Sequence, residues 1–453
     1  MRVEQLTLQH FRGYDNATFD FQPGMNLLVG VNGAGKSSVL EVLRLLLSHM
    51  LPNMSATKEA AFRAAQDDIS IGHADLYASL RLRIEDVTLG GSMRLWRKLD
   101  EVSTATSSKD AYEFLGVVAE HHQAVFITKA VPKDTPHDVV QMMKAALRED
   151  QARRKTLPKK LQLADNQAPA IYFSAHRSLI NLDAETKREQ SIGGQATAFV
   201  GALEAERQLK VAQFARWWVA LESLTHELDD SVATRAAAQM RALEQAVIHF
   251  LDNFTSVRAI DKPKPTLLLS KAGTTLDVRL LSDGERSVLA LVLDIARRLA
   301  QANPQLADPL HDGHAVVLID EIDLHLHPQW QRSIVQKLTE TFPQCQFIAT
   351  THSPQIIGEV APEQIIILEV GKQPYRPDQS LGMDTNWILQ FLMGTPNRNV
   401  TTNQQLERIS DLIEDAEYEQ AATEIAKLRQ RMPDDPELVK LQVRLARMQI
   451  LGT

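Results

Sequence analysis

The residues from Gly30 to Ser37 have the types and the spacing of a phosphate-binding loop. They fit the pattern G-x-x-x-x-G-K-[ST], between an apolar run at 25–29 and a helical pattern at 39–49. Glycines let backbone N–H groups turn toward phosphate oxygens, Lys36 reaches the β- and γ-phosphates, and the Ser37 hydroxyl binds Mg²⁺. A chance glycine turn before a helix is the alternative interpretation. The candidate nucleotide-binding residues are Gly30, Asn32, Gly33, Gly35, Lys36, Ser37 and Ser38.

Two acids at the end of an apolar strand form a second candidate site. Asp320 and Glu321 follow the apolar residues 316–319, and such carboxylates are costly to bury unless they face a metal ion or water. Beside a phosphate-binding loop, Asp320 would hold Mg²⁺ through its water shell, while Glu321 would orient and deprotonate an attacking water. Without that loop, a strand that ends in solvent-exposed acids would be the better interpretation.

A third motif, at 281–286, reads Leu-Ser-Asp-Gly-Glu-Arg. A serine followed three residues later by a glutamate is the pattern of a capping box, and a capped helix N-terminus is also a place where phosphate binds. The motif closely resembles the LSGGQ signature of ABC-type ATPases, in the form found in their chromosome-maintenance and repair branch. The resemblance implies that ATP is sandwiched in a head-to-tail homodimer. In such a dimer, each copy contacts the other copy's nucleotide through Ser282, Asp283, Gly284 and Glu285.

Two further segments match the same family. Residues 323–328 resemble the D-loop, which crosses the dimer interface, and this implies that Asp323 contacts nucleotide held by the other copy. Residues 349–354 resemble the switch segment, which implies a catalytic contact of His352 with the γ-phosphate.

Four more residues are candidates for a functional role. By its order along the chain, Gln66 is the candidate for the Q-loop residue near the metal. Arg12 is similar to a residue that approaches nucleotide in repair-type ATPases, and a surface arginine in a turn is an equal alternative. His325 and His327 suggest a metal pair in isolation, but the lack of a third ligand nearby favours a structural role.

The order of the motifs along the chain indicates which branch of the ABC-type ATPases the chain resembles. The phosphate loop and the signature lie far apart, as in RecF and SMC proteins, and the single cysteine, Cys345, excludes the Cys-x-x-Cys hook of the break-repair group. The runs 175–178, 281–286 and 319–328 and the tail from Gly382 are similar to the PtuA family, the ATPases of Septu-type and some retron-linked anti-phage systems. That resemblance implies a sensor or regulatory ATPase that controls a separate HNH nuclease of the PtuB type. It leaves room for assemblies larger than a dimer.

Two other functions fit the same motifs. A RecF-like DNA-repair ATPase would bind DNA without a dedicated nuclease, and a scaffold would use the ATP-bound dimer as a structural switch with very slow turnover. Nucleic-acid phosphates could contact the basic residues Arg153, Arg154, Lys155, Lys159 and Lys160. A solvated charged face is the favoured interpretation of that run.

An α/β fold is needed to bring these motifs together. We expect an ABC-type core with a mixed sheet, an N-terminal antiparallel hairpin, an inserted helical arm and a C-terminal helical segment. The corresponding ranges are an N-terminal lobe at 1–98, a mixed insertion and helical arm at 99–262, a C-terminal lobe at 263–383 and a helical region at 384–453. Strands are predicted at 74–84, 91–98, 170–173, 266–270, 276–279, 315–319, 346–350 and 364–368, and helices at 137–154, within 195–254, from 283 and from 328.

The sequence of the tail from 417 to 448 predicts two antiparallel helices, separated at Pro433 and Pro436. Because two helices bury little by themselves, we expect their apolar positions to pack on the core or on another chain. These positions are Ala421, Ile425, Leu428, Leu438, Leu441 and Leu445.

Composition limits the remaining possibilities. With 453 residues, 44% hydrophobic and 23% charged, the chain has the composition of a globular protein. The N-terminus lacks a signal pattern and the apolar helical stretches carry charges, so a cytoplasmic protein without a membrane span is expected. A net charge of -8 does not favour general polyanion binding, and nucleic acid would need a local patch.

Overall fold

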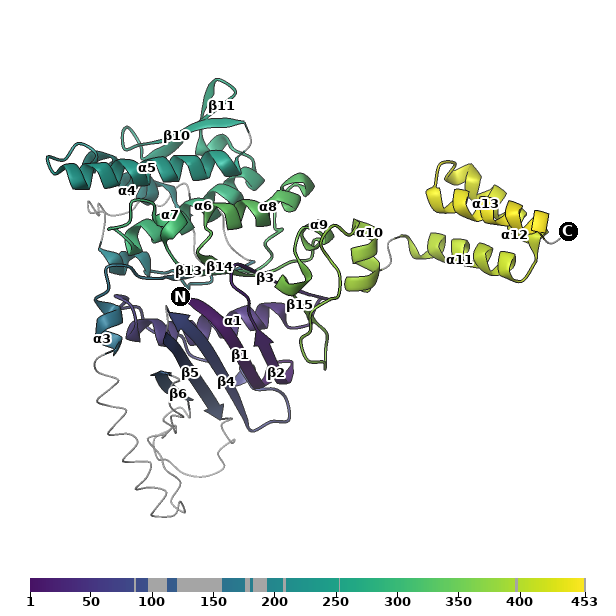
Figure 1. The fold of residues 1–453 in the computed structure, drawn as a ribbon, viewed down its shortest axis with the longest axis horizontal. Helices are drawn as coiled ribbons and strands as arrows, with labels where there is room; N and C mark the ends of the chain where they lie inside the picture. The colour runs from purple at the N-terminus through teal and green to yellow at the C-terminus, as the bar shows by residue number, and fades with distance from the viewer. Residues whose placement is uncertain are drawn as a thin grey trace, which may run out of the picture. The chain divides into compact units, whose positions relative to one another are not determined.

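The computed structural model describes residues 1–84, 87–96, 112–119, 157–175, 180–181, 194–206, 209–251, 253–395 and 398–451. They form two compact units, Met1–Met383 and Asp384–Thr453 (Figure 1). The helix predicted at 137–154, the basic residues Arg153, Arg154 and Lys155, and most of the run 175–178 lie outside the described residues.

One sheet of the first unit is antiparallel, with strand order β2-β1-β4-β5-β6. Its strands are β1 (Arg2–Phe11), β2 (Tyr14–Asp20), β4 (Asp75–Ile84), β5 (Val87–Trp96) and β6 (Tyr112–Ala119). Strands β1 and β2 form the predicted N-terminal hairpin, whose closing pair is Phe11 and Tyr14. Buried residues alternate with more exposed ones along β4, so one face of the sheet is turned inward.

The second sheet consists of five parallel strands in the order β15-β3-β14-β13-β7. They are β15 (Ile365–Leu368), β3 (Met25–Gly30), β14 (Cys345–Thr350), β13 (Ala315–Ile319) and β7 (Ala170–Phe173). All their residues are buried, which explains the continuous apolar runs in the sequence. Because the strands are parallel, the loops that follow β3, β13 and β14 leave from one edge of the sheet.

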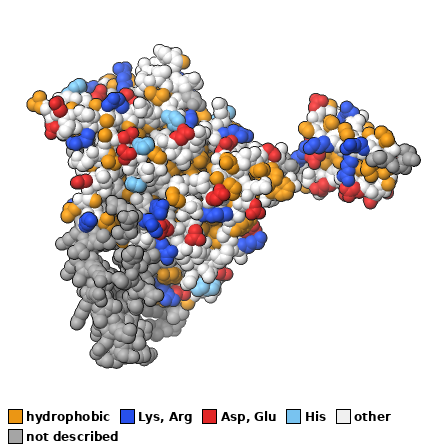
Figure 2. Space-filling view, viewed as in Figure 1, with side chains coloured by type: hydrophobic (Ala, Val, Ile, Leu, Met, Phe, Trp, Pro, Cys, Tyr) orange, Lys and Arg blue, Asp and Glu red, His pale blue; other side chains and the backbone are white. Residues whose placement is uncertain are grey.

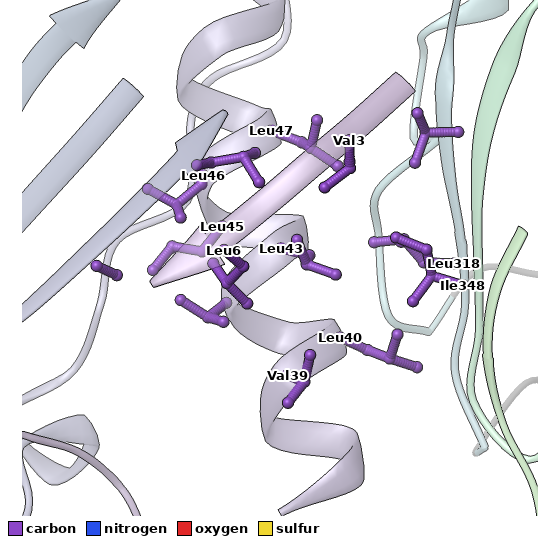
Figure 3. Packing of buried hydrophobic residues seen from close by; sticks show 14 of the residues in the cluster. Val3, Leu6, Val39, Leu40, Leu43, Leu45, Leu46, Leu47, Leu318 and Ile348 are labelled. Atoms are coloured by element: carbon purple, nitrogen blue, oxygen red, sulfur yellow. The ribbon is translucent and has the colours of Figure 1, made fainter. Parts of the chain in front are cut away.

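Helix α1 (Lys36–Met50) lies between the two sheets (Figure 3). Leu45 lies beside Leu6 of β1, and Leu318 and Ile348 of the parallel sheet lie on the other side of the helix. Each buried leucine contributes about 1.5–3 kcal/mol relative to an exposed one. This packing fixes the N-terminus of α1, and with it the phosphate loop, relative to both sheets.

Helices cover the side of the parallel sheet that faces away from the antiparallel one (Figure 1). They are α4 (Val211–Leu224), α5 (Asp230–Phe250), α6 (Asp283–Ala302), α7 (Pro309–Asp312) and α8 (Pro328–Thr341). A small antiparallel sheet of β10 (Phe254–Ile260), β11 (Thr266–Lys271) and β12 (Thr274–Asp277) packs against α4 and α5. The range 99–262 thus supplies β7 to the parallel sheet and β10 to the sheet that contains β11.

The stretch 195–254, predicted as helical, begins with a different structure. A 3₁₀ turn at Gln195–Ala198 and a loop to residue 206 precede β9 (Leu209–Lys210) and α4. Arg298 of α6 donates hydrogen bonds to the carbonyl oxygens of Ala198 (2.6 Å) and Val200 (3.0 Å). Arg44 of α1 donates to the carbonyl oxygen of Leu203 (3.1 Å). This segment, residues 194–206, is called the strap below because it joins α1 to α6.

The remaining elements of the first unit are short. Among the described residues they are α3 (Leu157–Gln162), β8 (Ile180–Asn181), α9 (Pro354–Ile357) and the 3₁₀ turns Leu51–Asn53, Gln66–Asp68 and Pro362–Gln364. The strand predicted at 276–279 ends at Asp277 and continues as a 3₁₀ turn, Val278–Leu280. Figure 2 shows Lys and Arg side chains interspersed with Asp and Glu over the visible face of this unit. Within the described ranges, no helix is long and apolar enough to cross a membrane.

The second unit has a core of its own. After α10 (Thr385–Trp387) it contains α11 (Val400–Glu414), α12 (Tyr418–Arg431) and α13 (Pro436–Leu451). The expectation that the apolar positions of the tail pack on the core or on another chain is wrong, because α11 supplies a third apolar face. One cluster buries Leu406, Ile409, Ile413, Ala421, Ile425, Leu428, Leu438, Leu441 and Leu445.

Candidate active site

The loop between β3 and α1 turns around its own lysine. Nζ of Lys36 donates hydrogen bonds to the carbonyl oxygens of Gly30 (2.8 Å) and Val31 (3.0 Å). Burial lowers the pKa of the Lys36 ammonium, while the nearby carboxylates of Asp320 and Glu321 act in the opposite direction. An ammonium has three donors, so a further one remains for an anion such as phosphate.

Two glycines of this loop sit where a side chain would collide. A Cβ atom on Gly30 would overlap the carbonyl oxygen of Leu368 on β15. Gly35 has a left-handed φ of +93°, and its Cβ would lie 2.6 Å from the hydroxyl of Tyr14. That hydroxyl donates to the carbonyl oxygen of Ala34 (3.0 Å), and its burial raises the pKa of Tyr14. Tyr14 of the N-terminal hairpin therefore contacts the phosphate loop at Ala34 and Gly35 and supports its backbone.

The carboxylate of Asp320 accepts two hydrogen bonds from hydroxyl groups. Its Oδ1 accepts from Oγ of Ser37 (3.1 Å) and from Oγ1 of Thr350 (2.6 Å). Hydroxyl and carboxylate oxygens are the hard ligands that Mg²⁺ prefers. Ser37 and Asp320, which are distant in sequence, thus meet as a donor set that fits this ion.

Glu321 has a backbone conformation that is rare for a residue with a side chain. Its φ is +50°, in the left-handed region. The N–H of Glu321 donates to Oγ1 of Thr350 (2.7 Å), and the N–H of Ile322 donates to the carbonyl oxygen of Thr350 (2.9 Å). Thr350 therefore contacts both acids. Sequence reasoning gave it no role, although a hydroxyl residue that ends a buried strand beside the acids was an available signal.

A polar cavity of about 280 Å³ joins the phosphate loop to these acids. All of its lining residues except Thr350 were proposed from the sequence. The lining consists of Asn32, Gly33, Gly35, Lys36, Ser37, Ser38, Asp320, Glu321, Thr350 and His352.

Asp323 holds the backbone of the switch segment. Its Oδ1 accepts hydrogen bonds from Oγ1 of Thr351 (2.6 Å) and from the N–H of His352 (3.3 Å). Asp323 does not line the cavity of its own chain. The segment that resembles a D-loop is therefore linked to the histidine that faces the cavity.

The two other histidines of this region have no metal cluster around them. Nδ1 of His327 accepts from the N–H of Gln329 (3.3 Å) and so caps α8. His325 has a left-handed φ of +63°. Among the described residues, no group of three His, Cys, Asp or Glu side chains could hold a metal ion.

The signature motif begins α6 with the reciprocal capping box. Oγ of Ser282 accepts from the N–H of Glu285 (3.3 Å), and Oε2 of Glu285 accepts from the N–H of Ser282 (2.9 Å). A Cβ atom on Gly284 would lie 2.8 Å from the carbonyl oxygen of His325. Asp283 is exposed and pairs with Arg286. None of the residues 282–285 lines the phosphate cavity of the same chain.

Arg12 and Gln66 differ in their relation to the cavity. Nη1 of Arg12 donates to Oγ of Ser38 (3.4 Å), a lining residue, and its Nε donates to Asp68 (2.8 Å). Gln66 lies in a 3₁₀ turn, and its side-chain amide donates to the carbonyl oxygen of Trp96 (3.1 Å). Gln66 does not line the cavity that contains Ser37 and Asp320, and this bond holds its amide at β5.

Two family models match separate parts of the chain. Residues 102–358 match the family model described as "AAA domain, putative AbiEii toxin, Type IV TA system". Residues 1–86 match the model "AAA ATPase domain".

Individual proteins extend the similarity over most of the chain. The "Retron Ec83 probable ATPase" of Escherichia coli is 27% identical, over 98% of this chain and 86% of the relative. "Septu protein PtuA" of Bacillus thuringiensis is 20% identical, over 81% of this chain and 76% of the relative. Among solved structures, an SMC head bound to the C-terminal winged-helix domain of ScpA covers 84% of this chain, and the match covers 98% of that head. It has 15% identity and a TM-score of 0.46.

Proposed function

This chain belongs to the AAA-domain ATPase family whose model it matches over residues 102–358, and we propose that it hydrolyses ATP in the cavity between the phosphate loop and the Asp320–Glu321 pair. The observation that carries the proposal is the meeting of Lys36, Ser37, Asp320 and Glu321 around one polar cavity. They come from α1 and from the end of β13, and the parallel sheet sets their separation.

In this proposal each residue has a chemical task. Lys36 and the backbone N–H groups of the loop bind the β- and γ-phosphates. The Glu321 carboxylate orients a water molecule and takes its proton as the water oxygen attacks the γ-phosphorus. The bond to the bridging oxygen then breaks, and ADP and inorganic phosphate leave. His352 contacts the γ-phosphate from the switch side of the cavity.

The residues present also fit Mg²⁺. Ser37 and Asp320 would hold it, because their oxygens already share one hydrogen bond at the cavity. Bound there, the ion would neutralise phosphate charge that develops in the transition state. Thr350 would keep the Asp320 carboxylate oriented through its 2.6 Å hydrogen bond.

The active site would be completed by a second copy of the chain, arranged head to tail. The motif 281–286 starts a capped helix but takes no part in the cavity of its own chain. Two aliphatic side chains are exposed at these motifs: Leu280 (71% exposed) directly precedes the signature, and Val31 (52% exposed) lies within the phosphate loop. Burial of both would favour an interface between the two motifs. Ser282, Asp283, Gly284, Glu285 and Asp323 would then face the partner's nucleotide.

The biological role proposed here comes from the relatives. A retron ATPase and a Septu protein match this chain over most of its length. We infer that the chain is the sensor or regulatory ATPase of an anti-phage complex and that it controls a separate HNH nuclease. Co-expression with an HNH nuclease encoded beside this chain, followed by affinity purification through this chain, tests the pairing: co-purification is expected, and failure to co-purify would contradict it.

Two substitutions test the hydrolytic function itself. We expect Lys36→Ala to abolish ATP binding, because it removes a phosphate contact. We expect Glu321→Gln to leave binding intact and to lower turnover about 100-fold or more, because it removes only the general base. ATP binding by equilibrium dialysis and phosphate release measure the two defects separately. Turnover of Glu321→Gln at the parental rate would assign the base to another residue.

A further inference from the structure

A lysine outside the signature motif neutralises the charge of Glu285. Nζ of Lys271, the last residue of β11, lies 2.6 Å from Oε1 of Glu285. The same Nζ lies 4.9 Å from the ring centroid of Phe254, which pairs with Lys271 across the sheet. A cation–π contact and an ion pair therefore fix this ammonium.

The second oxygen of Glu285 holds Ser282. Oε2 accepts hydrogen bonds from the N–H and from the hydroxyl of Ser282, both at 2.9 Å. Ser282 is exposed, whereas Glu285 is only 8% exposed. A chain of contacts thus runs from Lys271 through Glu285 to the hydroxyl that begins α6.

The charge of Glu285 matters because of what the proposed dimer would bring to this helix end. A helix N-terminus attracts phosphate, but a bare carboxylate at the same place repels it. Burial raises the pKa of Glu285, but the hydrogen bonds from Lys271 and Ser282 outweigh burial and lower it overall. The carboxylate is therefore ionised at neutral pH, and Lys271 is its counter-charge.

We propose that Lys271 is a positioning residue for ATP-dependent dimerisation, which neutralises Glu285 and keeps it oriented so that Ser282 is presented to nucleotide held by a second copy. This inference rests on the proposed function, because it requires the composite site. Lys271 does not line the phosphate cavity of its own chain. Its loss should therefore leave ATP binding by the monomer unchanged.

The test uses the full-length chain with Glu321→Gln, so that ATP persists. Analytical ultracentrifugation gives the ATP concentration at which half of the protein is dimeric. We expect Lys271→Ala to raise this concentration about tenfold, which corresponds to roughly 1.4 kcal/mol, and Lys271→Arg to preserve most of the parental behaviour. Lys262→Ala, at an exposed lysine between β10 and β11, is the matched control and should change nothing.

A second variant separates charge from packing. If Lys271 acts by neutralising Glu285, adding Glu285→Gln to Lys271→Ala removes the orphan charge and restores most of the lost dimerisation. If Lys271 only stabilises the sheet, the added substitution restores nothing and the inference is overturned. If Lys271→Ala dimerises at the same ATP concentration as its parent, the role of Lys271 is contradicted while the proposed function stands. If the parent binds ATP yet never dimerises, the composite site of the proposed function fails with it.

Discussion

Thr350 connects the two acids of the site at the scale of single residues. Its hydroxyl donates to Asp320 and accepts from the N–H of Glu321, whose backbone is in the left-handed region. No sequence motif assigned it this position. The threonine therefore orients the carboxylate of the proposed metal ligand, Asp320, and holds the backbone of the proposed base, Glu321.

We predict that Thr350→Val, which keeps the shape and removes the hydroxyl, lowers kcat about tenfold or more. A hydrogen bond to a charged group contributes roughly 1.5–3 kcal/mol, and each 1.4 kcal/mol is a factor of ten in rate. ATP affinity should change much less, because Lys36 and the loop remain. Thr350→Ser is the control and should keep most of the activity. A valine variant with parental kcat would remove Thr350 from the account.

The sequence predicted those site residues whose geometry is set by the residues next to them in the chain. The loop 30–37 and the pair Asp320–Glu321 are short runs, and each sets its own local geometry. The role of Thr350 depends on the pairing of β14 with β13, which no local pattern encodes. The prediction that Gln66 lies near the metal rested on its position in the order of motifs. That order does not determine the direction of a side chain in a 3₁₀ turn.

Among the elements, the strap has the least recognisable sequence. Its buried residues, including Ala198, Phe199 and Leu203, predicted the start of a long helix. They are buried because the strap lies between α1 and α6, and its carbonyl groups bond to arginines from both helices. Tertiary contacts override helical periodicity here. Helices α1 and α6, with clear start signals and long apolar patterns, were predictable.

We predict that Arg298→Ala lowers the free energy of unfolding by about 3 kcal/mol, the low end for breaking a buried ion pair. Arg298 is 1% exposed and bonds to Asp294 (3.0 Å) as well as to the strap. The low end applies because Asp294 keeps Arg297 as a partner. Urea denaturation measures the effect, with the exposed Arg241→Ala on α5 as the control. Equal midpoints for the two variants would contradict a stabilising role of the strap.

At the scale of the whole molecule, the chain divides between Met383 and Asp384 into two units with separate cores. The apolar faces of α12 and α13 were visible in the sequence. The region 384–453 was predicted to be helical, but the packing of Leu406, Ile409 and Ile413 of α11 against α12 and α13 was not predicted, because it depends on contacts between elements. The three helices of the second unit therefore bury this apolar cluster among themselves.

From this independence we predict that a chain ending at Met383 folds and hydrolyses ATP within about twofold of the parental rate, since no cavity residue is removed. Thermal unfolding and phosphate release test this directly. Co-purification of the truncated chain with the proposed HNH nuclease then tests whether the second unit serves docking. Loss of the folded state on truncation would mean that the first unit depends on the second.

The proposal that two copies share each active site is tested most directly by mixing two inactive variants. Lys36→Ala removes one phosphate loop, and Ser282→Arg blocks one signature. A head-to-tail heterodimer of the two keeps one intact composite site, so random pairing leaves about a quarter of the parental sites. We predict that each variant alone releases no phosphate and that the equimolar mixture recovers up to this fraction of activity. An inactive mixture, in which fluorescence energy transfer shows that subunits have exchanged, would contradict a site shared between two copies.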